Sequence, residues 1–300
     1  MKSGRVGEIK SSHGDQAVQV VLYVLIAIFA IITVLPFFYI VAGSFATERE
    51  LIERRFFIIP KTFSPNAYSY IFKDGKTLNG LWNSVVVTVV GTIINMFFSC
   101  TMAYPLSRPY LKGRNFFINM VIVTMLFSGG MVPSYILIAN VLKLRNTFWA
   151  LWLPGAINAF NMIIIKNYFQ GFPMELEESA RIDGANDLKI FIKVILPLSK
   201  PVLASVSLFY AVSHWNSYFN AMMYISDTNK EVIQVVLRRI IFMTSSLAVE
   251  EGLEWGPFGM PPEQSVQMAT TVVATVPILL VYPFIQKYFT KGVMLGAVKG

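Results

Sequence analysis

The sequence has few charged residues for its length. Charged residues make up 14% of the 300 positions, and hydrophobic residues make up 55%. A typical soluble domain carries about 25% charged residues, because polar groups must cover its surface. This chain has too few charges to build such a surface, and a lipid bilayer removes that requirement. The composition excludes an ordinary soluble domain and predicts an integral membrane protein.

Cysteine and histidine are also scarce. Cys100 is the only cysteine, so an intrachain disulfide is impossible. His13 and His214 are the only histidines, which excludes a His/Cys metal cluster. The Gly-x-x-x-x-Gly-Lys-Ser/Thr loop that cradles nucleotide phosphates is missing as well. We therefore expect this chain to hold no metal and no cofactor of its own.

The net charge of +8 does not indicate nucleic-acid binding. The sequence has no basic groove interleaved with aromatic residues and no recognition motif of that kind. Basic residues instead flank long apolar segments, as they do in membrane proteins. We expect lipid as a partner and no nucleic acid.

Six long segments contain no charged residue. They cover residues 16–47, 77–107, 115–142, 146–165, 201–226 and 264–286. A helix needs about 20 apolar residues to cross the hydrocarbon core, and lipid offers no partner to free backbone groups. We predict an all-α membrane protein with one transmembrane domain, 1–300. Its spans are expected near 18–45, 80–104, 116–141, 147–166, 201–224 and 267–287.

The connections between these segments indicate the orientation. The short connection 108–114 contains Arg108, Lys112 and Arg114 and no acid, and the tail after residue 286 is also purely basic. Short basic connections face the cytoplasm. With six spans, this places both termini and residues 166–200 in the cytoplasm and the loop 227–263 outside. The first segment is too long for a signal-peptide core of about 7–15 residues, so we expect an uncleaved span.

The connection 171–200 has a pattern of its own. Pro173 suits a first helical position, and glutamates follow in the first turn, near the positive end of the helix dipole. Gly184 fits a C-terminal cap with a left-handed backbone, and Asn186 or Asp187 can cap a second helix. Apolar residues then recur at helical spacing, at Leu188, Phe191 and Val194. The pattern predicts two short amphipathic helices joined by a glycine elbow at the cytoplasmic membrane surface.

This segment resembles the EAA motif of ABC importer permeases. In that family Glu-Ala-Ala is followed after three residues by Gly, and after nine more by Ile-x-Leu-Pro. The matching residues here are Glu178-Ser179-Ala180, Gly184 and Val194-Ile195-Leu196-Pro197, with serine and valine as mild departures. The carbohydrate-type form of the motif is matched by Asp183-Gly184-Ala185 and Phe191.

Other parts of the chain extend the resemblance. The ending Gly296-Ala297-Val298-Lys299-Gly300 is similar to that of the smaller maltose-transporter permease. Phe127-Ser128-Gly129-Gly130 and Val281-Tyr282-Pro283-Phe284 resemble the branch that imports complex or oligomeric saccharides. The resemblance covers almost the whole chain and implies the type I importer permease fold, in the bacterial plasma (inner) membrane.

The resemblance also implies partners and roles. The chain would pair with a homologous second permease, two ATPase subunits that bind ATP and Mg²⁺, and an extracytoplasmic sugar-binding protein. The loop 227–263 would contact the binding protein. The residues implied to couple to the ATPase are Glu178, Ser179, Ala180, Asp183, Gly184, Ala185, Phe191 and Pro197. The tail residues implied to approach it are Gly296, Val298, Lys299 and Gly300.

Polar and aromatic residues within the spans are candidates for a sugar path. They are Asn158, Asn161, His214, Trp215, Asn216 and Tyr218. Amide and imidazole groups can hydrogen-bond to hydroxyls, and aromatic rings can stack on sugar faces. The same residues could instead tie membrane helices together or anchor at the interface. The sequence is compatible with both the sugar-path and the packing interpretation.

Two other classes of function compete with the importer. A secondary transporter or channel would work without an ATPase, but ion-coupled transporters usually need a charged residue inside the membrane. None of the six segments has one. A membrane-embedded enzyme would need a catalytic cluster, and His214 is the only histidine in a segment, with no carboxylate beside it in any of them. We therefore predict a translocation subunit and not an enzyme.

Overall fold

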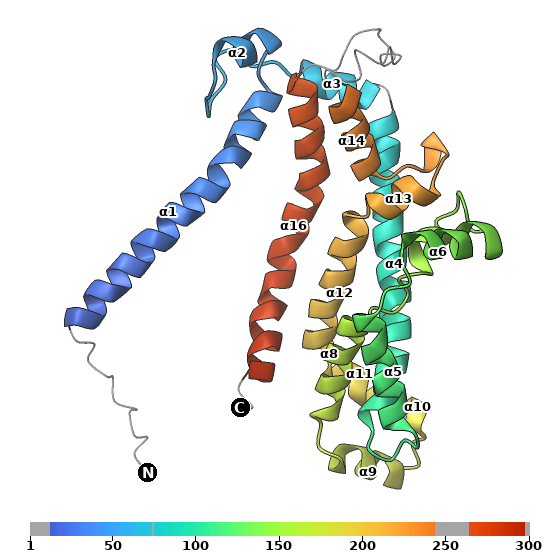
Figure 1. Ribbon diagram of the computed structural model, residues 1–300. Helices are drawn as coiled ribbons and strands as arrows, with labels where there is room; N and C mark the ends of the chain where they lie inside the picture. Colours follow the sequence, from blue (N-terminus) through green and yellow to red (C-terminus); the bar gives the residue numbers. More distant parts are fainter. Residues whose placement is uncertain (1–12, 74, 244–263, 298–300) are drawn as a thin grey trace. The chain divides into compact units, whose positions relative to one another are not determined.

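The computed structural model describes residues 13–73, 75–243 and 264–297 (Figure 1). The regular elements within these ranges are all helices. This confirms the predicted all-α fold. The chain divides into two compact units, one formed by residues 1–68 and 263–272 and the other by residues 69–262 and 273–300.

The first unit contains α1 (His13–Ser44), α2 (Glu48–Glu53), the start of α3 (Asn66–Lys73) and the start of α16 (Gln264–Ala297). Within this unit, the most apolar stretch of α1 is not buried. A helix with apolar residues on all sides suits a lipid environment. The turn after α2 is held by Glu50, whose carboxylate accepts hydrogen bonds from the backbone N–H groups of Lys61 and Thr62.

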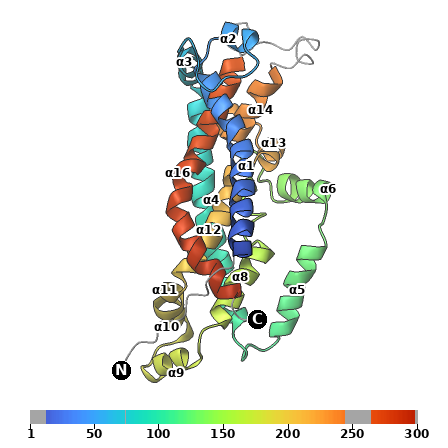
Figure 2. The ribbon, with the colours of Figure 1, turned by 90° about the vertical axis from the view of Figure 1, so that its left-hand side faces the viewer.

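The second unit is built around α4 (Lys76–Ser107). This helix packs against α12 (Lys200–Trp215), α8 (Ala159–Gln170) and α14 (Ile233–Met243). Figures 1 and 2 both show α4 and α12 running side by side. Glycine, serine and asparagine are prominent among the buried residues of α4, and small residues let membrane helices approach closely.

The two ends of this unit carry different elements. One end has α9 (Glu175–Ile182), α10 (Asp187–Ile190), η2 (Phe191–Ile195) and α11 (Leu196–Leu198), and the other has α13 (Phe219–Tyr224), η3 (Thr228–Lys230) and α14 (Figure 1). A hydrophobic core lies at each end. Tyr104, Phe169 and Phe191 belong to the first core. Val87, Trp152 and Tyr224 belong to the second.

Three described helices are long and apolar enough to cross a membrane without a break. They contain the candidate spans Val18–Ser44, Lys76–Ser107 and Gln264–Val281. Two more candidates are bent pairs. Arg114–Leu126 (α5) meets Met131–Val141 (α6, Met131–Tyr135, and η1, Ile136–Val141) at 113°, and Asp187–Leu198 meets Lys200–Trp215 at 83°. The first bend falls at residues 127–130, where Gly130 has a φ of 84°.

The fourth and fifth charge-free segments are interrupted. The fourth contains α7 (Trp149–Trp152) and the start of α8, separated by residues 153–158. The fifth contains α12 and α13, separated by residues 216–218. Broken membrane helices are tolerated where the freed backbone groups face protein or a wet cavity. The two breaks are therefore candidate positions for a binding site.

Hydrogen bonds join connections that the predicted order of spans puts on the same side. Asn146, with a φ of 61°, accepts from the backbone N–H groups of Ser226 and Asp227 at 3.2 and 3.0 Å. At the opposite end, the Arg114 guanidinium donates to the Gln170 side chain at 3.1 Å. Connection 143–145 and the start of connection 227–263 thus share one end of the unit, and connections 108–114 and 166–200 share the other.

Candidate functional site

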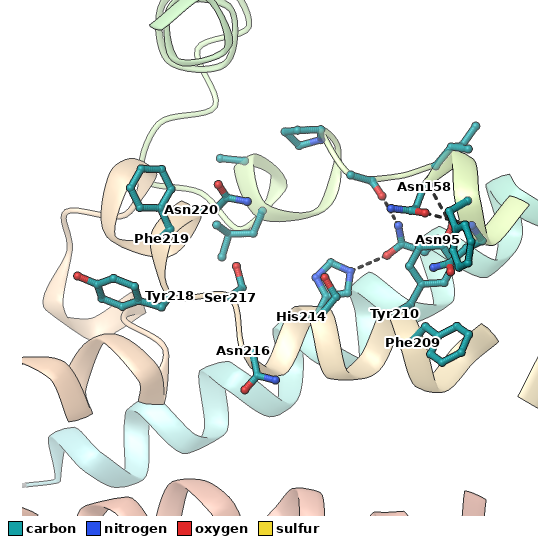
Figure 3. Close-up of a pocket in the computed structure, with 18 residues that line it drawn as sticks. Asn95, Asn158, Phe209, Tyr210, His214, Asn216, Ser217, Tyr218, Phe219 and Asn220 are labelled. Atoms are coloured by element: carbon teal, nitrogen blue, oxygen red, sulfur yellow. Dashed lines mark hydrogen bonds between the residues drawn. The ribbon is translucent and has the colours of Figure 1, made fainter. Parts of the chain in front are cut away.

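A polar cavity of about 780 Å³ lies where the two interrupted segments meet (Figure 3). No charged residue of the described chain lines it. Its polar lining residues are Asn95, Asn158, Asn161, Tyr210, Ser213, His214, Asn216, Ser217, Tyr218 and Asn220. Phe160, Phe209 and Phe219 add aromatic surface. The cavity therefore combines amide and hydroxyl groups with aromatic rings.

The cavity brings together five of the six residues predicted for the sugar path, which are Asn158, Asn161, His214, Asn216 and Tyr218. Trp215 lies elsewhere. Its buried indole Nε1 donates to the Ala274 carbonyl at 3.1 Å, on another face of α12. Each residue of an α-helix is rotated by about 100° from the previous one. His214 and Trp215, although adjacent in sequence, therefore point to different surroundings.

The helix break at Asn158 places several polar groups in the cavity wall. Asn158 caps α8, and its Oδ1 accepts from the backbone N–H of Asn161 at 3.1 Å. The backbone N–H of Asn158 donates to the Tyr210 hydroxyl at 3.1 Å. That hydroxyl also lies 2.6 Å from Ser99 Oγ. Because the first N–H groups of a helix have no partner inside it, a break needs such capping groups.

A second contact joins α12 to α4. His214 Nε2 and Asn95 Oδ1 lie 2.5 Å apart, and Asn95 Nδ2 donates to the Gly155 carbonyl (Figure 3). The sequence alone does not single out Asn95, because one polar residue within an apolar segment also fits helix packing. The available signal was Gly91, one helical turn away, which leaves room for the imidazole ring.

This lining suits a ligand rich in hydroxyl groups. Asparagine amides both donate and accept hydrogen bonds, and serine and tyrosine hydroxyls do the same. The aromatic residues supply flat apolar surface. Among the described residues there is no group of three metal-ligating side chains.

The predicted helix-elbow-helix is present in residues 171–200. Gly184 has a φ of 77°, its N–H donates to the Arg181 carbonyl at 3.0 Å, and the Ala185 N–H donates to the Ala180 carbonyl at 2.9 Å. These two bonds form a Schellman motif, which ends α9. Asn186 caps α10, since its Oδ1 accepts from the Lys189 N–H at 2.9 Å. Both predicted caps are confirmed.

The eight residues implied to couple to an ATPase divide into three groups by exposure. The exposed ones are Glu178, Ser179, Asp183, Gly184 and Pro197. Ala180 and Ala185 are half-buried against the core. Phe191 is buried, and its ring stacks on Tyr104 with 4.9 Å between centroids. Leu188 is 64% exposed and is not part of that core; Ile190 is buried instead. The first helix of the segment thus exposes polar residues, and the second helix packs into the hydrophobic core.

Glu177, one residue before the motif, is buried and faces Arg108 at the end of α4. Arg108 Nη2 lies 2.5 Å from Glu177 Oε1, and both side chains are 2% exposed. Burial raises the pKa of Glu177, and the Arg108 charge opposes that rise. The sequence does not predict this pair, because nothing local indicates which glutamate of the group turns inwards.

The structure does not describe every predicted residue. Gly296 lies in the last turn of α16, whereas Val298, Lys299 and Gly300 lie outside the described residues. The described part of the loop 227–263 ends at Met243. The predicted roles of the tail and of the outer loop therefore stay predictions.

Comparison with known proteins agrees with this architecture. The family described as "Binding-protein-dependent transport system inner membrane component" matches residues 110–295. The chain is 53% identical over 269 residues to Protein LplC of Bacillus subtilis, covering 90% of each chain. It is 52% identical over 279 residues to the polygalacturonan/rhamnogalacturonan transport system permease protein YtcP of the same organism, covering 93% of this chain and 97% of YtcP.

A solved structure of an ABC importer also matches this chain. One chain in the crystal structure of a bacterial ABC transporter involved in the import of the acidic polysaccharide alginate matches with a TM-score of 0.84 and 33% identity. The match covers 94% of this chain and 100% of that chain. The EAA-like segment lies within the family match, so the predicted resemblance is confirmed. This protein belongs to the family of inner-membrane components of binding-protein-dependent transport systems, as a multi-pass ABC importer permease.

Proposed function

We propose that this permease forms half of the translocation path for an oligosaccharide. The observation that carries the proposal is the uncharged polar cavity at the breaks of the fourth and fifth segments. Its amides, hydroxyls and aromatic rings match the hydroxyls and flat faces of sugar rings. The names of YtcP and of the alginate importer support a substrate of several sugar units.

The proposed partners are a homologous second permease, two ATPase subunits and an extracytoplasmic sugar-binding protein. ATP and Mg²⁺ would be bound by the ATPase subunits, since this sequence has no phosphate-binding loop. The exposed face of α9, with Glu178, Ser179 and Asp183, is the surface proposed to dock in an ATPase. Closure of the ATPase pair would then move the spans as rigid bodies between two access states.

The proposed orientation has both termini in the cytoplasm. The end of the second unit that carries α9 would then face the ATPase. The end that carries α13 and α14 would face the binding protein. The basic connection 108–114 supports this direction, and it lies at the same end as α9.

Uptake into proteoliposomes tests the substrate path. The chain would be co-expressed with its partners and offered galacturonan, rhamnogalacturonan and arabinan oligosaccharides. Asn161→Ala and His214→Ala are expected to reduce uptake of the transported sugar roughly tenfold or more, because a buried hydrogen bond to a ligand is lost. Asn115→Ala is the matched control, since Asn115 is exposed on α5 away from the cavity.

The results separate the importer from its main alternative. Uptake that needs ATP and is impaired only by the cavity variants supports the proposal. Uptake that continues without ATP or any ATPase subunit would support a secondary transporter or channel instead. Full uptake by both cavity variants would contradict the assignment of the cavity.

Co-purification tests the ATPase contact. Glu178→Lys reverses an exposed charge on α9 and is expected to remove the ATPase from the purified complex while the chain still inserts. Glu53→Lys, a charge reversal at another exposed glutamate, in α2, should leave the complex intact. Equal retention of the ATPase by both variants would place the contact elsewhere.

A further inference from the structure

Two adjacent glutamates in α9 have opposite surroundings. Glu177 is 2% exposed, whereas Glu178 points to solvent. Glu177 is also the only buried residue of α9, and the apolar Leu176 and Ile182 of the same helix are 39% and 86% exposed. The attachment of α9 to the rest of the permease therefore depends strongly on one carboxylate.

Arg108, the partner of Glu177, contacts three helices at once. It is the C-cap residue of α4, and its Nη1 donates to the Phe169 carbonyl near the end of α8 at 3.2 Å. Its guanidinium carbon lies 4.9 Å from the centre of the Tyr104 ring. With Glu177 Oε1 at 2.5 Å from Nη2, this single side chain connects α4, α8 and α9.

A second ion pair near the elbow cannot replace this connection. Arg181 donates to Asp187 Oδ1 at 2.7 Å and to the Tyr110 hydroxyl at 2.8 Å, but Arg181 and Asp187 are 45% and 64% exposed. Exposed ion pairs are weakened by water and salt. A buried pair is screened far less, so the attraction between its charges is stronger.

Burial of this pair is not explained by stability alone. Apolar residues of similar volume commonly replace a buried ion pair without loss of stability. What an ion pair adds is a defined direction and distance between the groups that carry it. In this chain those groups are the ends of two spans and the helix proposed to dock in the ATPase.

We propose that Arg108 and Glu177 are a positioning pair, which fixes α9 to α4 and α8 so that movement of the docked helix moves the spans. This inference rests on the proposed docking of α9 in an ATPase. Glu178 makes the contact with the partner, and Glu177 transmits the movement within the permease. Variants of the two neighbours should therefore fail in different ways.

The test uses the assembled complex and does not depend on the sugar. Cys100 is replaced by serine, and Asn220→Cys places a thiol in the cavity wall. Labelling of this thiol by a maleimide is compared before and after vanadate traps the ATPase closed. The ratio of the two rates measures how far the movement of the ATPase reaches the cavity.

Glu177→Gln and Glu178→Gln are the matched pair. Glu177→Gln is expected to retain the ATPase and its hydrolysis while the vanadate-dependent change in labelling falls by roughly threefold or more. Glu178→Gln is expected to weaken ATPase retention and to keep the full change in labelling in the complex that remains. An unchanged labelling response in Glu177→Gln would overturn the proposal.

A double variant separates positioning from folding. Arg108→Met with Glu177→Met should insert and retain the ATPase, because it leaves no unpaired buried charge. Its labelling response should stay reduced, because two flexible methionines do not fix a direction. A full response in this variant would show that packing alone suffices and would overturn the proposal. Failure of the wild-type chain to bind any ATPase would instead contradict the proposed function itself, and this inference with it.

Discussion

His214 Nε2 lies 2.5 Å from Asn95 Oδ1, and this contact depends on the absence of a side chain at Gly91. A Cβ built at Gly91 would lie 2.5 Å from the same imidazole nitrogen, well inside van der Waals contact. The glycine on α4 thus creates the space in which the α12 histidine reaches the cavity wall. One small residue on α4 thus sets the position of a polar side chain in the cavity wall.

Gly91→Ala should therefore displace the imidazole. Overpacking of this kind costs about 1–3 kcal/mol of stability, and we expect a lower midpoint of thermal unfolding in detergent together with reduced uptake. Gly129→Ala is the control, because no atom lies within 4 Å of a Cβ built there. In a His214→Ala background the stability effect of Gly91→Ala should largely disappear, as a double-mutant cycle would measure. A loss that persists there would mean that the clash is with another group.

The sequence predicted what depends on neighbours in the chain. Charge-free length gave the helical spans, and the caps at Gly184 and Asn186 follow from local backbone chemistry. Pairings across the fold were not predictable. Asn95 meets a residue 119 positions away, and the same α9 sequence would allow another glutamate to turn towards Arg108. Such choices depend on how the helices pack against one another, and local sequence patterns do not show this.

Gly184 provides a prediction about backbone conformation. Its φ of 77° lies in the left-handed region, yet no atom lies within 4 Å of a Cβ built there. The stability lost in Gly184→Ala should therefore come from backbone strain alone and amount to about 1–2 kcal/mol. Gly184→Asn should cost less, because asparagine tolerates this conformation. Thermal unfolding of the purified permease measures both, and equal losses would show that the backbone is not the cause.

Glu50 gives a pH-dependent prediction. The backbone N–H of Lys61 donates to its carboxylate at 2.8 Å and, with Thr62 and Arg54, lowers the pKa of Glu50 from its usual 4.5. A lowered folded-state pKa means that the stabilisation is complete above pH 4.5 and is lost as the pH falls through the lower folded value. The turn after α2 should therefore loosen only in acid.

Hydrogen exchange of the turn, residues 57–64, measures this effect. At pH 7, Glu50→Gln should exchange faster than wild type in this segment, and near pH 3 the difference should shrink. Wild type and variant are compared at the same pH, so that the intrinsic pH dependence of hydrogen exchange cancels. Glu53→Gln is the control, because the Glu53–Arg49 pair is exposed and contributes little. A difference of the same size at both pH values would contradict the assigned role of the carboxylate.

The single cysteine makes the orientation measurable. Cys100 is buried, so a membrane-impermeant maleimide should leave the wild-type chain unlabelled both in intact cells and after lysis. Thr228 and Lys112 are both exposed. Thr228 lies in η3, which is joined to the start of α4 by the hydrogen bond from Asn79 to the Asn229 carbonyl, and Lys112 follows the other end of α4. If the basic connection faces the cytoplasm, Thr228→Cys is labelled in intact cells and Lys112→Cys only after lysis. The reverse pattern would invert the proposed orientation, and α9 could then not meet a cytoplasmic ATPase. Because the hydrogen bonds of Asn146 tie its connection to the end that carries Thr228, Arg145→Cys should behave like Thr228→Cys.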